Sequence, residues 1–319
     1  MSFEQPIMPP VPAELIRDDI ARVKDCMLFS SGDYQVYLLR VAQAPSLMQE
    51  LFRLREVTFR AVGEGTGLSL DTDPYDEYYW QMILWNVPNG EITGAYRLGF
   101  GPEIMREKGI EGFYTSTLFN YSPEIAPLLS KSIELGRSFI VPKYQREVMG
   151  LKMLLAGLAM CTVKCPEASF FMGPVSMSAD MPWPYQTLAV HYLMRDFSLP
   201  GADKLVTNTH PFVPDPSIEN PDEILADVPR GDIDAFDHRL AALSDGKYRL
   251  PVLFRKYFSC SARVACFNVD PLFSNSLDAL IFLRHTEYPE NTLRSLMRCA
   301  TPELRNAVWM HFRGVPYTD

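Results

Sequence analysis

An apolar stretch at residues 132–142, near the middle of the chain, carries two charged residues, Glu134 and Arg137. A strand that is buried on both faces is almost continuously apolar, so a carboxylate and a guanidinium within it are costly unless they are paired. Pro142 ends the stretch, because proline donates no hydrogen bond to a sheet. The pattern therefore predicts a central strand with a Glu134–Arg137 pair, and it leaves open whether that pair is structural or catalytic.

Directly after this strand the apolar residues change to a helical spacing. Between Val148 and Leu158 they recur every three or four positions, which predicts a helix. A strand followed at once by a helix places backbone N–H groups at the helix mouth, where anionic groups bind readily.

The rest of the chain shows the same two patterns. Alternation of apolar and polar residues predicts strands, three- and four-residue periodicity predicts helices, and residues 86–91 predict a hairpin turn. The proline-rich first 30 residues are expected to hold one short helix. Strands are expected at 34–39, 81–85, 92–98, 169–175, 263–269 and 280–283, and helices at 45–60, 183–197 and 235–244.

An acidic run at residues 70–77 follows a glycine-rich loop at 63–67. The glycines lack the spacing of a phosphate-binding loop, and the acidic run lacks the glycine and the final glutamate of a calcium loop. A solvated turn and a pocket for a cationic amine remain as alternatives for the run. Residues 99–131 form a long excursion between predicted strands, and their aromatic content predicts that they cover a cleft.

Composition narrows the class of protein. The chain has 319 residues, of which 47% are hydrophobic and 22% charged, as in a globular protein. Its net charge of −9 argues against general nucleic-acid binding. No export signal is evident, no apolar run is long enough to span a bilayer, and the six cysteines and five histidines show no metal-ligand spacing. These features predict a cytoplasmic protein with reduced thiols and no metal.

Several motifs in a fixed order resemble a known family, the bacterial GNAT-fold N-acyltransferases that make ornithine and glycine lipids, some of which are labelled haemolysin-like. These enzymes are similar in core plan to the acyl-homoserine-lactone synthases. The resemblance extends from about residue 30 to about residue 285. The motifs are LREVTFR (54–60), LDTDPYD (70–76), GAYRL (94–98), FYTSTLF (113–119), IELGRSFI (133–140), and LPVLFRKY (250–257) followed by FNVDPLFSNSLDAL (267–280).

The resemblance implies an α+β, GNAT-like acyltransferase fold, in which helices flank a mixed central sheet. It implies an N-terminal extension at 1–30, a GNAT-like core at 31–209, and a C-terminal extension at 210–319 that completes the same domain. The strand at 133–141 takes the place of the splayed strand that receives the acyl donor in that fold.

The resemblance also implies an activity. Family members move a fatty acyl group, often 3-hydroxylated, from the thioester of acyl carrier protein to the α-amine of an amino acid. The product is an N-acyl amino acid or a precursor of an amino-acid lipid. The thioester is then a co-substrate, no further cofactor is needed, and contact with a membrane would come through the lipid product. The reaction requires a deprotonated amine, a polarised carbonyl and a slot for the pantetheine arm.

Residue roles follow from the motif positions. Glu134 is expected to accept a proton, directly or through water, and Arg137 to organise the charged cluster. Asp71 is expected to cap or solubilise, and Glu64 matches no motif, so its role is open. Asp76 joins Glu134 and Arg137 as a catalytic candidate, and the acceptor-binding candidates are Arg55, Asp73 and Arg97.

The residues expected to bind the acyl donor bear on whether it is a thioester of CoA or of acyl carrier protein. Acetyl-CoA-using relatives have glycines in the loop at the helix mouth, and here Val148 takes the place of the first of them, which crowds a pyrophosphate cradle. An acidic carrier protein would instead meet a local basic patch that includes Lys152, for which a solvated helix start is the alternative. The donor-binding candidates are Phe139, Ile140, Lys143 and Arg146. Rival functions are a CoA-dependent small-acyl N-acetyltransferase and a non-catalytic module that binds acyl chains.

Overall fold

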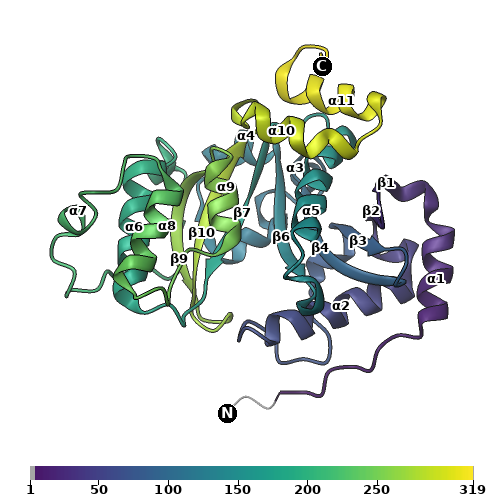
Figure 1. Cartoon of the computed structure of the whole chain (residues 1–319), viewed down its shortest axis with the longest axis horizontal. Coiled ribbons are helices and arrows are strands. Elements are labelled where there is room, and N and C mark those ends of the chain that lie inside the picture. Colours follow the sequence, from purple (N-terminus) through teal and green to yellow (C-terminus); the bar gives the residue numbers. More distant parts are fainter. Residues whose placement is uncertain (1–3, 319) are drawn as a thin grey trace.

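The computed structural model describes residues 4–318, apart from the side chain of Val148. A mixed eight-stranded sheet runs through the molecule in the order β1-β2-β3-β4-β6-β7-β10-β9 (Figure 1). The strands of this sheet are β1 (Met27–Ser31), β2 (Tyr34–Leu39), β3 (Trp80–Asn86), β4 (Glu91–Phe100), β6 (Ser132–Ile140), β7 (Phe170–Met177), β9 (Arg263–Asp270) and β10 (Ser276–Arg284).

Strands β6 and β7 form the one parallel pair among the described strands, and they separate after a short contact. Their register runs only from Ser132 opposite Phe170 to Glu134 opposite Met172. Gly173 marks the point of separation, because a Cβ atom there would lie 2.3 Å from the carbonyl oxygen of Leu135. The sheet is therefore split along part of its length, between β6 and β7.

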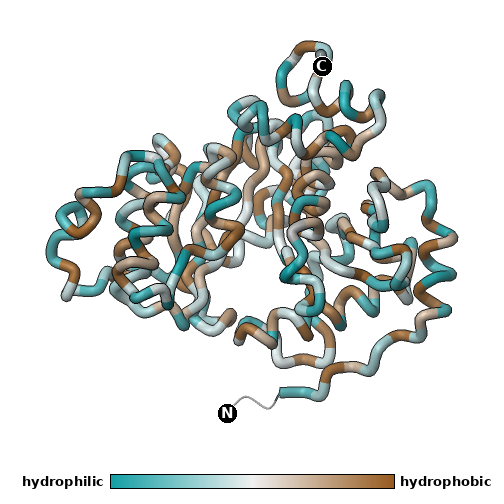
Figure 2. Tube along the Cα trace, in the orientation of Figure 1, coloured by the Kyte–Doolittle hydropathy of each residue, from teal (hydrophilic) through white to brown (hydrophobic). Residues whose placement is uncertain are grey.

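One face of the sheet is covered by helices that share a large apolar core with it. Helix α5 (Val148–Cys161) crosses β1–β4 on this face, and α9 (Val252–Ser259) packs on the same face. The apolar colour in Figure 2 accordingly concentrates on the central strands and on α5. The other helices of this face are α6 (Trp183–Phe197), α8 (Ile233–Leu243), α10 (Glu290–Leu296) and α11 (Pro302–Arg313), and α7 (Pro221–Ile224) lies in the exposed segment before α8.

The opposite face has two smaller cores. Helices α1 (Ala13–Arg22) and α2 (Pro45–Arg60) cover the half formed by β2, β3 and β4. The 99–131 segment covers the half that includes β7 and β10. This segment contains α3 (Gly101–Glu107), α4 (Ala126–Leu129) and β5 (Phe119–Tyr121), which pairs with β8 (Val206–Asn208) in a second, two-stranded sheet.

The predicted strands and helices of the central region are confirmed, most closely at α2, β2 and the β3–β4 hairpin. Strand β1 was not predicted, and it extends the sheet across the expected boundary at residue 30. Strands β9 and β10 join the same sheet from the C-terminal extension. Among the described helices, none combines the length and the apolar character that crossing a bilayer requires.

Candidate functional site

A cavity of about 250 Å³ lies where β6 and β7 separate. Its lining residues come from both faces of the sheet. Tyr96, Leu135 and Tyr257 belong to the core under α5 and α9, whereas Leu118 belongs to the core under the 99–131 segment and Arg137 contacts Asp71 of the acidic run that follows α2. The cavity therefore passes through the sheet, and it allows two reactants to approach one point from opposite sides.

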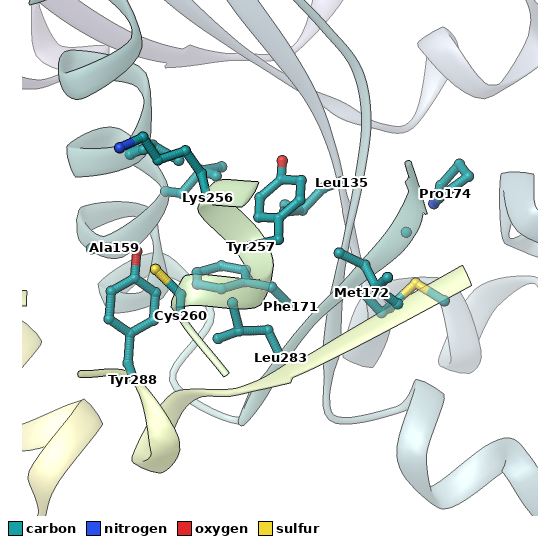
Figure 3. Close-up of a pocket in the computed structure, with 14 residues that line it drawn as sticks. Leu135, Ala159, Phe171, Met172, Pro174, Lys256, Tyr257, Cys260, Leu283 and Tyr288 are labelled. Atoms are coloured by element: carbon teal, nitrogen blue, oxygen red, sulfur yellow. The ribbon is translucent and has the colours of Figure 1, made fainter. Parts of the chain in front are cut away.

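A narrower apolar cavity adjoins the first on the α5 side. The two cavities share Leu135, Pro174 and Tyr257. Figure 3 shows Phe171, Tyr257 and Cys260 together beside α9, with Met172 and Pro174 farther away, and nearly all of the lining side chains are apolar. Such a lining suits an alkyl or pantetheine chain, which gains free energy from the burial of its methylene groups.

Strand β6 is distorted beside the cavity. Its register against β4 shifts between Phe139, which is opposite Ala95, and Gly136, which is opposite Arg97. Arg137 lies within the shift and has a positive φ of 45°, a conformation that residues other than glycine rarely adopt. A bulge of this kind removes a residue from the hydrogen-bond ladder, so it frees a backbone group beside the cavity and turns the Arg137 side chain.

Three arginines and three aspartates form a buried network next to the bulge. Arg55 Nη1 lies 2.8 Å from Asp76 Oδ1, and Arg55 Nε lies 3.2 Å from Asp71 Oδ2. The side chains of these three residues are at most 4% exposed. Burial acts to raise the pKa of Asp76, but Arg55 and Arg97 outweigh it and lower that pKa to about 2. Asp71 and Asp76 of the acidic run are therefore neither solvated nor open to a cationic amine.

The other two arginines, Arg97 and Arg137, lie on the sheet and bind aspartates of the same acidic run. Arg97 Nη1 on β4 lies 2.5 Å from Asp73 Oδ1, and Arg137 contacts Asp71 and Asp73 at 3.1 and 3.3 Å. Burial acts to raise the pKa of Asp71 as well, but Arg55 and Arg137 lower it overall. Of this network only Arg137 lines the cavity.

The predicted Glu134–Arg137 pair is wrong, because the two side chains have different partners. The carboxylate of Glu134 accepts hydrogen bonds from the Tyr79 hydroxyl and from the backbone N–H groups of Tyr114 and Thr115. Burial raises the pKa of Glu134, and the hydrogen bonds from Thr115 and Tyr79 partly offset this effect. The bulge is the physical reason for the different partners, since it directs Arg137 toward the acidic run.

Comparison with known proteins identifies the family. The family model described as acetyltransferase (GNAT) domain matches residues 54–155. A glycine N(alpha)-acyltransferase of Bacteroides thetaiotaomicron is 32% identical over 274 residues, which cover 82% of this chain and 80% of that protein. The chain belongs to the GNAT-fold N-acyltransferases.

A second glycine N(alpha)-acyltransferase, from Phocaeicola vulgatus, is 30% identical and covers 82% of both proteins. A solved CoA-dependent acyl-homoserine lactone synthase, MesI, aligns only weakly, with a TM-score of 0.31 and 16% identity over 48% of this chain and 76% of that chain. The predicted fold and the amide-forming acyltransferase class are thus confirmed for this GNAT-fold N-acyltransferase.

The predicted donor residues of this N-acyltransferase are dispersed. Phe139 is buried under α2 and packs edge-on against Phe59 at 6.2 Å. Ile140 packs beside the start of α5. Lys143 is exposed and its Nζ lies 2.8 Å from Glu91 Oε2. Arg146 is also exposed, with no ion pair inside the described part of the chain. The side chain of Val148, on which the preference for carrier protein rested, lies outside the described residues.

Several groups at the cavity were not predicted from the sequence. Asp270 and Asp278 of the C-terminal strands line it, together with Glu64, whose role the sequence left open. Tyr79 was also missed as the partner of Glu134. The order of apolar and polar residues in β10 already places Asp278 inside a buried strand, and this was the available signal.

Proposed function

We propose that this N-acyltransferase transfers a fatty acyl group from acyl carrier protein to the α-amine of an amino acid. The observation that supports it is the cavity through the sheet, which is apolar toward α5 and carries Arg137 and carboxylates on the opposite side. A long-chain thioester matches the first side and a zwitterionic amino acid matches the second. Glycine is the first acceptor to test, because it is the acceptor in the names of two relatives.

In this proposal the donor enters from the α5 side. The acyl chain and pantetheine arm occupy the apolar cavity around Leu158, Phe171 and Tyr257. This placement puts the thioester carbonyl near the bulge of β6, where a backbone N–H freed from the ladder is available to stabilise the developing oxyanion. Binding of both reactants in one cavity replaces a bimolecular encounter by a reaction within a complex.

The acceptor enters from the opposite side. Arg137 is the member of the buried network that reaches the cavity, and we assign it to the carboxylate of the amino acid, which it attracts as a planar cation. Arg55, Arg97, Asp73 and Asp76 then act by holding Arg137 and the bulge in place. Glu134 anchors the 113–117 segment, whose Tyr114 side chain lines the same cavity.

The donor surface in this proposal lies at the start of α5. Arg146 is exposed two residues before the helix, next to the N-cap residue Glu147, where backbone N–H groups and a cation together favour the phosphate of a carrier's prosthetic group. A carrier protein offers one phosphate and an acidic surface. Lys143 contributes less attraction, since Glu91 already neutralises it.

A transfer assay with purified enzyme tests the proposal. One 3-hydroxy fatty acyl chain is supplied as the thioester of acyl carrier protein and, separately, of CoA, with glycine and other amino acids as acceptors. Mass spectrometry should detect an N-acyl amino acid, and kcat/KM should be higher with the carrier protein. Equal or better use of acyl-CoA would contradict the choice of donor, and the absence of any N-acyl amino acid would contradict the function.

A further inference from the structure

Most buried carboxylates of this protein have an arginine partner. Such pairing is expected, because an isolated charge is costly in a protein interior. It leaves few carboxylates free to bind anything else. The pairs are Asp19 with Arg22, Glu50 with Arg53, Glu56 with Arg60, Asp71 and Asp76 with Arg55, Asp196 with Arg195, and Asp237 with Arg249.

Asp278 on β10 is an exception. The residue is 3% exposed, and within the described residues no lysine, arginine or histidine nitrogen lies within 4 Å of its carboxylate. Its neighbours across the sheet are Ser176 on β7 and Asn268 on β9. Its carboxylate accepts hydrogen bonds from neutral hydroxyls alone among the described side chains, a long one of 3.5 Å from Ser276 and one from Ser176. A buried carboxylate is thus left without a cation.

This carboxylate lines the cavity on the side of the sheet that Arg137 also faces. Side chains alternate along a strand, so Asp278 shares a face with Leu280 and Phe282, which pack under the 99–131 segment. Arg137 contacts Asp71 and Asp73 on this same side of the sheet. Asp278 and Arg137 therefore present opposite charges to one cavity.

Two more carboxylates reach the cavity from other elements. Asp270 ends β9, and Glu64 lies in the loop after α2. The two elements touch, because the Ser274 hydroxyl donates a hydrogen bond to the Gly63 carbonyl and Phe59 packs against Phe273 at 6.1 Å. The β9–β10 turn and the glycine-rich loop thus close one end of the cavity with three carboxylates.

The electrostatic state of Asp278 agrees with a site for a cation. Its pKa is raised to about 7, chiefly by burial; repulsion from Asp270 and Glu64 adds to the increase, and hydrogen bonds from Ser176 and Ser276 oppose it. Burial also raises the pKa of Glu64, to which Asp180 adds. A bound ammonium group would remove this mutual repulsion, since opposite charges favour the ionised carboxylate.

We propose that Asp278 binds the ammonium group of the acceptor amino acid and takes one proton from it, while Asp270 and Glu64 make its surroundings negative. This inference rests on the proposed function and names the acceptor-binding end of that same cavity. The C-terminal extension then supplies the group that activates the nucleophile, and Arg137 holds the acceptor's carboxylate elsewhere in the same cavity.

The proton balance of the reaction is complete with these groups. The ammonium group gives one proton to Asp278 and becomes a neutral amine. The amine nitrogen attacks the thioester carbonyl carbon, the C–N bond forms and the C–S bond breaks. The second proton leaves the nitrogen for the departing thiolate, which becomes a thiol, and Asp278 returns its proton to solvent. The net products are an amide, a thiol and one proton.

The test is Asp278→Asn, measured as kcat/KM for glycine against pH with a saturating acyl-carrier donor. At pH 7 we expect a fall of about 100-fold or more, the usual scale for loss of a general base. The wild-type rate should rise as Asp278 loses its proton around pH 7. The variant should lack this limb and should recover as the pH approaches the pKa of the amine itself. Asp227→Asn, at an exposed aspartate, is the matched control and should match the wild type.

Stability distinguishes a catalytic role from a structural one. Asp278 has a pKa raised from 3.8 to about 7 in the folded protein, so the fold loses stability as the pH rises between these two values, and above the higher one the full penalty of the buried charge is present. Asp278→Asn should therefore keep or raise the melting temperature at pH 8. Should this variant fail to fold, Glu64→Gln at the partly exposed neighbour tests the same cluster, and it should raise the KM for glycine without changing the KM for the donor.

The outcomes separate this inference from the proposed function. If the wild type acylates glycine and Asp278→Asn shows the same kcat/KM and pH profile, the inference is overturned and the function stands. If Glu64→Gln, as the fallback, leaves the KM for glycine unchanged, the inference is overturned as well. If the wild type acylates no amino acid at all, both fail.

Discussion

The arginine–aspartate network and the carboxylate end of the cavity are both buried and both acidic in sequence, yet they differ in one respect. In the network each of Asp71, Asp73 and Asp76 contacts an arginine. At the cavity Asp270 and Asp278 have no arginine or lysine within 4 Å in the part of the chain described. The paired charges of the network hold the strands and Arg137 in place, and the carboxylates left without a cation are available to a substrate.

Stability should change most when the arginine–aspartate network is disrupted. Arg55→Ala leaves Asp71 and Asp76 buried without their main partner, so the free energy of unfolding should fall by about 3–5 kcal/mol. Denaturant unfolding measures this change. Arg106→Ala, in an exposed pair with Glu107, is the control and should change stability by less than about 0.5 kcal/mol. A stable Arg55→Ala enzyme that has lost its activity would assign the network to catalysis.

Glu134→Gln is an intermediate case, because Glu134 has no cationic partner among the described residues, yet its carboxylate accepts three hydrogen bonds. The amide replaces one acceptor by a donor that faces N–H groups. We expect a loss of about 1.5–3 kcal/mol of stability, the usual worth of a hydrogen bond to a charged group, with turnover of the folded enzyme within about tenfold of wild type. Urea unfolding and kcat are measured on the same preparation.

Tyr79→Phe is the companion variant, since it removes one donor and keeps the carboxylate. It should destabilise the fold by about 0.5–1.5 kcal/mol and leave kcat nearly unchanged. The opposite pattern for Glu134→Gln, a roughly hundredfold loss of kcat with stability intact, would make Glu134 the proton acceptor that the sequence predicted.

Substitution of the surface charges at the start of α5 should change the kinetics least. Arg146→Glu should raise the KM for acyl carrier protein several-fold at low salt and leave kcat unchanged, because exposed charges act mainly on the encounter. The effect should fade at high salt. Lys143→Glu should have less effect, since Lys143 is already paired with Glu91, and Lys24→Glu on another surface should have none. Equal effects of all three would contradict a local docking site.

Local patterns were sufficient to predict the framework of the fold. Helix α2 and the β3–β4 hairpin each have a periodicity or turn within a few residues, and both were predicted within one or two residues of their bounds. Strand β1 was missed because it is five residues long and is defined by pairing with β2. Strands β5 and β8 were missed for the same reason, since each has three residues and finds its partner far along the chain.

The site was predictable where a motif names its residues and not where partners lie far apart. Motif positions named Arg55, Asp73, Arg97 and Arg137 as site residues, and the structure places these four in one network. The motifs could not show that a bulge turns Arg137 away from Glu134, because a bulge depends on the register against β4. The carboxylate end of the cavity also depends on register, since Asp278 meets it only through the pairing of β10 with β7.

If donor and acceptor meet in the cavity between β6 and β7, a Gly136→Leu substitution should block the reaction. Gly136 lines the cavity, and a Cβ atom added there has no heavy atom within 4 Å apart from its chain neighbours. The leucine side chain should enter the cavity without disturbing the core. We predict a folded enzyme with an unchanged melting temperature and no detectable N-acyl transfer, while Ser217→Leu on an exposed segment keeps full activity. A folded Gly136→Leu enzyme with wild-type transfer would place the reaction elsewhere.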